Sequence, residues 1–137
     1  MTPDTPGSRA LLLLAALFGA SGVALGAFGA HGLKNLLEPR LLEVFNTAVQ
    51  YQLLHALALL ALALWTRPQT ARALRLAGWA WVVGIVLFSG SLYAYVLSYS
   101  LWGVRLLAMI TPLGGVFFIL GWLALLWAAW KMPTQTP

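Results

Sequence analysis

Apolar residues run through this chain in four long segments instead of alternating with polar ones. The first segment, from Ala10 to Ala30, contains a single polar side chain, Ser21. An uninterrupted apolar segment of this length can cross a bilayer as a helix. Because no water reaches the hydrocarbon core, each backbone polar group must bond within its own segment, and barrel strands would be shorter and alternating. The pattern therefore predicts an all-α fold, a membrane-spanning four-helix bundle.

Short polar connections separate the other three spans. Span two is predicted to begin at Pro39, which suits the first turn of a helix, with its purely apolar part at residues 56–65. Span three is expected at residues 76–97 and span four at residues 111–130, with Thr111 as the N-cap. Before span four, residues 106–110 are either an interfacial turn or a helical extension kinked at Pro112.

Aromatic residues near the ends of span three are expected to lie at the two membrane–water interfaces, where such rings concentrate. Trp79 and Trp81 would mark one interface. Tyr93, Tyr95 and Tyr99 would mark the other.

The chain has room for one domain, which we expect at residues 10–131. Disordered tails are expected at residues 1–9 and 132–137, because both ends are rich in proline and small polar residues. A cleaved secretory signal is the alternative interpretation of the first span, since Arg9 precedes the apolar run. That run is longer than the usual apolar region of such signals.

Composition agrees with a membrane protein. Hydrophobic residues make up 61% of the chain and charged residues 8%, against about 45 to 50% and about 25% in soluble domains. The net charge is +5, but the basic residues stand beside apolar spans, which favours the lipid bilayer as their partner and not nucleic acid. One predicted side carries Arg9, Arg67, Arg72, Arg75 and Lys131, and the other carries Lys34, Arg40 and Arg105. The larger group predicts that both termini are cytoplasmic.

The chain lacks the residue types that several kinds of catalytic, metal-binding and transport sites require. The chain has no cysteine, and its only acids, Asp4, Glu38 and Glu43, lie outside the middle of any span. A four-helix exporter driven by protons would need a carboxylate at depth. No nucleophile with a base, metal-ligand spacing or phosphate-binding loop is present, so we expect no catalytic residue, no metal, no cofactor and no enzymatic activity.

Small residues recur along the first span with alternating spacings of four and three. Since lipid tails are as apolar as leucine, spans associate by close packing, and bare backbone permits it. The predicted helix-packing seam comprises Gly19, Gly22, Gly26 and Gly29. This seam serves packing within the chain, or else it faces a second copy in a homo-oligomer or a larger membrane complex.

Polar side chains at depth gather on span two. Thr47, Tyr51 and His55 recur every four residues, which places them on one side of a helix, and Gln52 lies one turn before His55. Such groups either join spans by hydrogen bonds or handle a ligand or proton. His31 stands among glycines at the end of span one. Haem ligation by the two histidines is disfavoured, because His55 lies about 24 Å along its helix from Pro39, at 1.5 Å per residue.

Four motifs, in order, resemble one family. They are Gly26-Ala27-Phe28-Gly29-Ala30-His31-Gly32-Leu33-Lys34, Tyr51-Gln52 with His55-Ala56-Leu57-Ala58, Leu87-Phe88-Ser89-Gly90-Ser91-Leu92-Tyr93, and Thr111-Pro112-Leu113-Gly114-Gly115 followed by Gly121-Trp122. They resemble the YgdD family of small inner-membrane proteins. The resemblance implies a multi-span protein of the bacterial inner membrane with no established role and no catalytic residue to carry over.

The positions in these motifs coincide with the polar positions found from spacing. Together they define a candidate polar intramembrane site of His31, Tyr51, Gln52, His55, Ser89 and Tyr93. Our leading interpretation is a non-enzymatic structural or accessory membrane protein. The alternative is binding or permeation of a small molecule or proton around Tyr51, Gln52 and His55.

Overall fold

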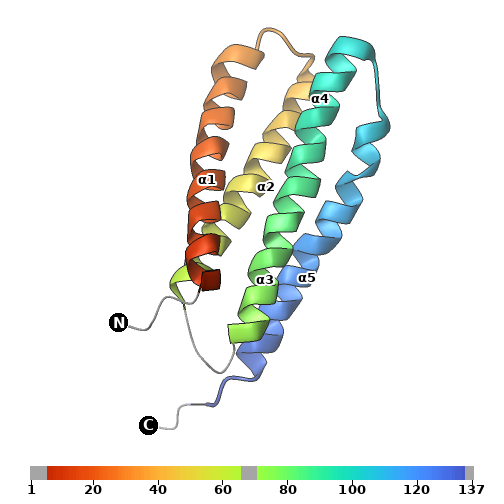
Figure 1. Ribbon diagram of the computed structural model, residues 1–137. Coiled ribbons are helices and arrows are strands. Elements are labelled where there is room, and N and C mark those ends of the chain that lie inside the picture. Colours follow the sequence, from red (N-terminus) through yellow and green to blue (C-terminus); the bar gives the residue numbers. More distant parts are fainter. Residues whose placement is uncertain (1–5, 66–70, 135–137) are drawn as a thin grey trace.

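The computed structural model describes residues 6–65 and 71–134, and the regular structure in these two ranges is entirely helical (Figure 1). Two segments, η1 and η3, are π-helical turns, and η4 is a short 3-10 helix. In chain order the elements are α1 (Pro6–Phe28), η1 (Gly29–Leu33), α2 (Pro39–Leu64), α3 (Ala71–Gly84), η3 (Ile85–Ser89), α4 (Gly90–Trp102), η4 (Leu106–Met109) and α5 (Thr111–Trp130).

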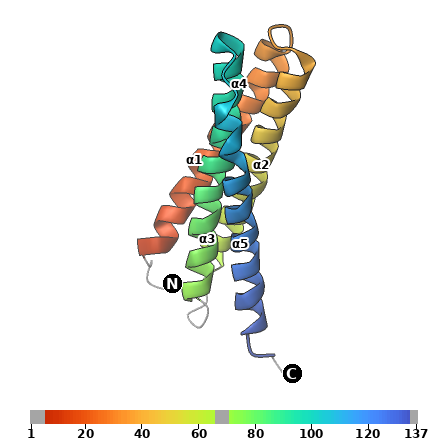
Figure 2. The same cartoon turned by 90° about the vertical axis from the view of Figure 1, so that its right-hand side faces the viewer.

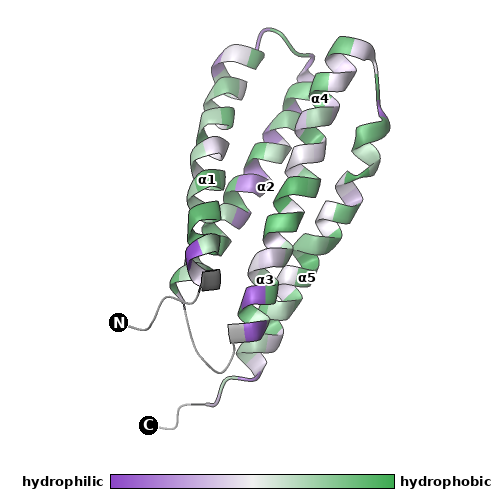
Figure 3. Cartoon of the chain, in the orientation of Figure 1, coloured by the Kyte–Doolittle hydropathy of each residue, from purple (hydrophilic) through white to green (hydrophobic). Residues whose placement is uncertain are grey.

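These elements form four continuous helical rods in the described part of the chain. Each is long and apolar enough to cross a bilayer, and their bounds are Ser8–Leu33, Pro39–Leu64, Arg72–Trp102 and Leu106–Trp130. Figure 3 shows hydrophobic residues along the lengths of the rods and several hydrophilic ones near their ends. The predicted all-α membrane-spanning four-helix bundle is thereby confirmed.

Helix α2 lies at the centre of the packing. In the most apolar part of its span 44% of residues are buried, against 17% in the first and fourth spans, which leaves those two mostly facing lipid. Helix α1 packs along α2, and α5 packs along α3 (Figures 1 and 2). Helix α1 begins, and α5 ends, at the same end of the bundle.

Several predicted boundaries differ from the observed ones. Helix α1 already begins at Pro6, so residues 6–9 of the expected tail are helical, while residues 1–5 lie outside the described residues. Arg72 and Arg75, expected in a loop, lie on the first turns of α3. The rest of that loop, residues 66–70 with Arg67, lies outside the described residues, as do residues 135–137 of the second expected tail.

The entry into α5 also differs. Residues 106–109 form the 3-10 helix η4, and α5 then begins at Thr111 with Pro112 in its first turn. The Thr111 side chain does not cap this helix. Its hydroxyl lies 2.7 Å from the Ser91 hydroxyl of α4, so it joins two spans.

The third span is one rod made of α3, η3 and α4. The π-helical turn η3 adds a residue to the turn, which shifts the facing of the side chains that follow. The rod ends at Gly103, whose φ of 68° is in the left-handed region. Glycine adopts this conformation without strain and so terminates the helix.

Glycines on α5 and at the end of α3 permit close contact between the third and fourth spans. A Cβ atom on Gly114 would collide with the backbone of Phe88, and one on Gly121 would collide with the Trp81 indole. Gly84 of α3 in turn accommodates the ring of Phe118. The Gly114 contact brings the α5 backbone against the π-helical turn, and the other two bring α5 against α3.

The glycines of the predicted seam lie mainly against α2. A Cβ on Gly22 would stand 2.7 Å from Leu53 Cδ2, one on Gly26 3.2 Å from Val49, and one on Gly29 2.9 Å from Phe45. Gly19 has nothing within 4 Å of that position. Gly19 therefore does not take part in the contact that the other three make with α2.

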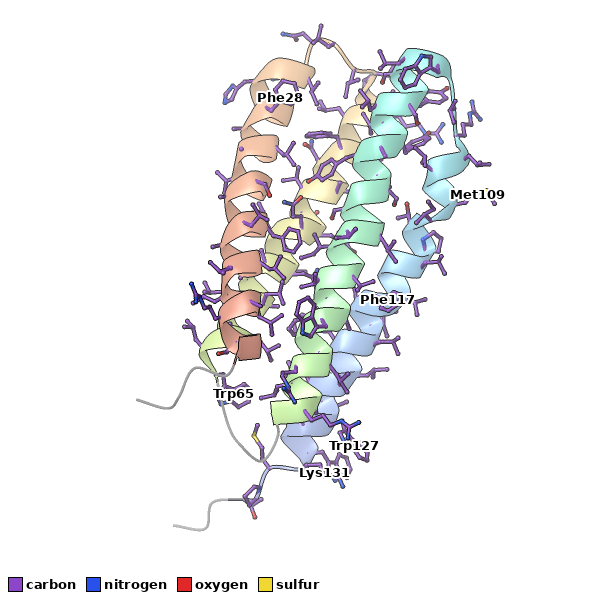
Figure 4. The ribbon with its side chains drawn as sticks, viewed as in Figure 1. Phe28, Trp65, Met109, Phe117, Trp127 and Lys131 are labelled. Atoms are coloured by element: carbon purple, nitrogen blue, oxygen red, sulfur yellow. The ribbon has the colours of Figure 1, made fainter. Side chains whose placement is uncertain are left out.

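Aromatic side chains lie at both ends of the bundle. Two of the aromatic residues predicted there lie inside the bundle instead. Figure 4 shows Trp65, Trp127 and Lys131 toward one end, and Lys131 Nζ lies 4.8 Å from the centre of the Trp127 ring. Trp81 is instead 1% exposed in the core, and the Tyr93 hydroxyl is hydrogen-bonded inside the bundle. The prediction that these two rings mark the interfaces was wrong, because each packs inward against another span.

Candidate polar site within the bundle

Gln52 joins three spans from the middle of α2. Its side chain is 4% exposed. The amide nitrogen donates to the backbone carbonyl of Phe18 at 2.9 Å and to the Ser21 hydroxyl at 2.8 Å, both on α1. The amide oxygen accepts from the Tyr93 hydroxyl of α4 at 2.7 Å. Both amide hydrogens are thus used, and each bond crosses to another span.

Ser21 completes this Gln52 network. Its hydroxyl donates to the Leu17 carbonyl of its own helix at 2.8 Å and accepts from Gln52. A serine that donates to the carbonyl four residues earlier needs no partner from water. The only polar side chain of the first apolar run is therefore satisfied inside the bundle.

His55, one turn further along α2, forms a second network that reaches α5. Trp122 Nε1 of α5 lies 3.2 Å from His55 Nε2, and the indole N–H can only donate, so Nε2 must accept. His55 Nδ1, 2.9 Å from the Tyr51 carbonyl, then carries the hydrogen and donates it. The ring is 2% exposed. Both ring nitrogens thus have hydrogen-bond partners, one on α2 and one on α5.

Aromatic rings surround His55 between α2, α5 and the third span. The Phe118 ring stacks on the imidazole with centroids 3.6 Å apart and planes 6° from parallel. The Trp81 and Trp122 centroids are 4.7 Å apart. The buried Trp81 Nε1 has no hydrogen-bond partner among the described residues, and its nearest aromatic neighbour is this Trp122 ring.

Serines connect the third span to its neighbours at the π-helical turn. Ser89, which is fully buried, donates to the Ala48 carbonyl of α2 at 2.7 Å. Ser91 donates to the Phe88 carbonyl at 2.9 Å, so the Thr111 hydroxyl must donate the hydrogen in the Ser91–Thr111 pair. The third span is thus bonded to α2 through Ser89 of the turn and to α5 through Ser91 of α4.

The six predicted site residues do not form one cluster. Gln52 and Tyr93 are directly bonded, and Ser89 reaches the same helix one turn away. Tyr51 and His55 face the aromatic rings near α5. His31 is exposed in η1 at the end of the bundle, away from both networks. No group of three potential metal ligands occurs among the described residues.

Sequence reasoning missed the partners on the outer helices. Ser21 had a readable signal, because a lone serine in an apolar run needs a bonding partner. Trp122 stood in one of the quoted motifs without an assigned role. Phe118 and the Phe18 carbonyl gave no signal, since a phenylalanine in an apolar span and a backbone oxygen look the same wherever they point.

Comparison with known proteins assigns the chain to a family. Residues 25–115 match the model of a family described as "Protein of unknown function (DUF423)". These residues include α2, the π-helical turn and the start of α5, and hence Gln52, His55 and Tyr93, whereas Ser21 and Trp122 lie outside the matched range. The chain belongs to this family.

Related proteins cover nearly the whole chain. A "UPF0382 membrane protein" of Haemophilus influenzae is 42% identical over 120 residues, 88% of this chain and 93% of the relative. The "UPF0382 membrane protein YwdK" of Bacillus subtilis is 42% identical over 124 residues, with 90% and 98% covered. The "UPF0382 inner membrane protein YgdD" of Escherichia coli is 40% identical over 131 residues, with 91% and 92% covered.

The predicted membership of the YgdD family is confirmed. The protein is a membrane protein of a family whose biochemical role has no established description, and the names of these three relatives mention no enzymatic activity. No solved structure matches this chain.

Proposed function

We propose that this DUF423 protein is a non-enzymatic structural or accessory protein of the bacterial inner membrane. The observation that carries the proposal is the saturation of its deepest polar groups. Both amide hydrogens and the amide oxygen of Gln52 are hydrogen-bonded to α1 and α4. Both ring nitrogens of His55 are hydrogen-bonded to α2 and α5. Groups committed in this way hold helices together, as expected for polar side chains that act as links between spans.

The alternative, binding or permeation of a small molecule or proton around Tyr51, Gln52 and His55, has less support. A permeation path needs polar atoms that face an open channel and exchange partners with the permeant. Here Gln52 bonds to α1 and α4 while His55 bonds to α5, and the rings of Phe118, Trp81 and Trp122 lie against His55. The bonded partners of Gln52 occupy the space beside it.

Charge supports an orientation with both termini in the cytoplasm. The described residues at the end where α1 begins and α5 ends include Arg9, Arg72, Arg75 and Lys131. The opposite end combines Lys34, Arg40 and Arg105 with Glu38 and Glu43. Basic residues near span ends favour the cytoplasmic side. The name of the Escherichia coli relative agrees with an inner-membrane location.

Reconstitution into liposomes tests the proposal. With a pH-sensitive dye inside and an imposed pH gradient, wild-type vesicles should lose the gradient no faster than protein-free vesicles. The variant His55→Leu should insert at unchanged abundance and behave in the same way. A wild-type proton leak that disappears in His55→Leu, with protein abundance unchanged, would reject the structural role in favour of the alternative.

The oligomeric state is a separate part of the proposal. Three seam glycines pack against α2, so a homo-oligomer or larger complex would have to use another surface, and Gly19 has open space beside its backbone. We propose that Gly19 is the first position to examine for such a contact.

A further inference from the structure

A cavity of about 230 Å³ opens at the end of the bundle opposite the chain termini. It lies where the connection between the first two spans meets the end of α4. Its walls are Leu36, Leu37, Glu38, Leu41, Tyr99 and Ser100. Since one water molecule occupies about 30 Å³ in the liquid, a group of several non-hydrogen atoms fits inside.

The position of this cavity corresponds to the lipid headgroup region. Helix α2 begins at Pro39 and α4 ends at Trp102, so the cavity sits at the junction of apolar spans and polar connections. Leu36 and Trp102 are 78% and 73% exposed, respectively. Exposed apolar and indole side chains at a span end favour the boundary between hydrocarbon and headgroups. A phospholipid is therefore the molecule with direct access to the cavity.

The walls offer an anion and hydrogen-bond acceptors. Glu38 is the one charged residue that lines the cavity, and its carboxylate does not cap α2. The Ser100 hydroxyl gives its hydrogen to the Val96 carbonyl at 2.7 Å, so toward the cavity it can only accept. A carboxylate and an accepting hydroxyl are complementary to a primary ammonium, which has three hydrogens to donate.

A cation stands behind the opposite wall. Arg105 Nη2 donates to the Tyr99 hydroxyl at 3.3 Å, and the guanidinium carbon lies 5.2 Å from the centre of that ring. An arginine placed in this way attracts a phosphate. The cavity thus has negative charge at one wall and positive charge beyond the other.

We propose that the cavity binds the phosphoethanolamine headgroup of a zwitterionic phospholipid. Its ammonium lies against Glu38 and Ser100, and its phosphate lies toward Arg105. A phosphocholine headgroup has no hydrogen to donate to the carboxylate, and a phosphoglycerol headgroup brings a net negative charge toward Glu38. This inference needs only a membrane location, so it stands or falls separately from the structural role proposed for the Gln52 and His55 networks.

Lipid binding to the purified full-length protein tests the inference. Short-chain phosphatidylethanolamine, phosphatidylcholine and phosphatidylglycerol are titrated against the protein in detergent, and bound lipid is counted by native mass spectrometry. Wild type should prefer the ethanolamine lipid by about fivefold, as suits a solvent-exposed charge pair. The variant Glu38→Gln should lose this preference. Glu43→Gln, which changes an exposed acid in the second turn of α2 outside the cavity, should keep it.

Two further results decide the matter. Arg105→Gln should weaken binding of all three phosphate-containing lipids, because it removes the attraction for the phosphate. Equal binding of the three lipids by wild type, preference for phosphatidylglycerol, or an ethanolamine preference that survives in Glu38→Gln would each overturn the proposal. Thermal unfolding of the variants in the same detergent verifies that lost binding does not arise from lost fold.

Discussion

At the scale of single residues, the bundle depends on a few polar side chains that would be costly in hydrocarbon if left unpaired. Gln52 is the clearest, because its three bonds reach α1 and α4 while its own helix needs none of them. The spacing of polar residues on span two identified Gln52. The third motif identified Tyr93, whose hydroxyl donates to the Gln52 amide oxygen. Their direct contact could not be predicted, because it depends on how far each helix is rotated.

Replacing Gln52 with leucine should destabilise the bundle. Interhelical hydrogen bonds in membranes average about 0.6 kcal/mol, so the loss of three amounts to about 2 kcal/mol in the free energy of unfolding. The change also leaves the Tyr93 hydroxyl without its acceptor. Equilibrium unfolding in mixed micelles measures the loss.

The matched control is Gln50→Leu, an exposed glutamine two residues earlier on the same helix. It should change the free energy of unfolding by no more than about 0.5 kcal/mol. Equal stability of the two variants would show that the Gln52 bonds contribute nothing to the fold.

At the scale of elements, the positions of the spans follow from hydropathy, while their internal irregularities do not. The predicted cores of all four spans lie inside observed helices. The π-helical turn η3 could not be foreseen, because nothing in residues 85–89 distinguishes a π-helical turn from ordinary helix, and its contacts with Gly114 and Ala48 are tertiary. Trp81 was misplaced for the same reason, since only tertiary contact tells a core tryptophan from an interfacial one.

Adding one methyl group at Gly114 should disturb the contact between α5 and η3. The new Cβ would collide with the Phe88 backbone, which cannot rotate away as a side chain would. Gly114→Ala should lower the free energy of unfolding by about 1–3 kcal/mol, the usual cost of overpacking.

The neighbouring Gly115 provides the control, because a Cβ there would meet only Phe88 Cδ2 at 3.9 Å, an ordinary contact. Gly115→Ala should be nearly neutral in the same unfolding measurement. If Gly114→Ala unfolds no more easily than Gly115→Ala, the close approach of α5 to the third span is wrong.

The contact between α1 and α2 yields a second pair of variants. Gly22→Leu should destabilise the protein, because even a Cβ at Gly22 would press on Leu53. Gly19→Leu has open space and should leave the monomer as stable as wild type. Crosslinking of wild type and both variants in membranes then reports the oligomeric state. Loss of a crosslinked oligomer in Gly19→Leu would place a second copy at this face, whereas an unchanged pattern would exclude it.

At the scale of the whole molecule, the absence of cysteine from the chain makes single-cysteine labelling direct. Asn35, in the connection between the first two spans, and Lys131, at the end of α5, lie at opposite ends of the bundle. A cysteine at Asn35 should react with a membrane-impermeant maleimide added to intact cells, and one at Lys131 should react only after the membrane is opened. The reverse pattern would invert the orientation proposed from the basic residues.

The central claim of this account is that Gln52, His55 and Ser89 are hydrogen-bonded to neighbouring spans in a dry interior. Ser89 is fully buried where the third span meets α2, and cysteine is close to serine in size. In membranes, Ser89→Cys should stay unmodified by a charged methanethiosulfonate reagent, which reacts with thiolates in water, while Asn35→Cys should react completely. Comparable modification of the two cysteines would reveal a water-filled path through the bundle and contradict the account.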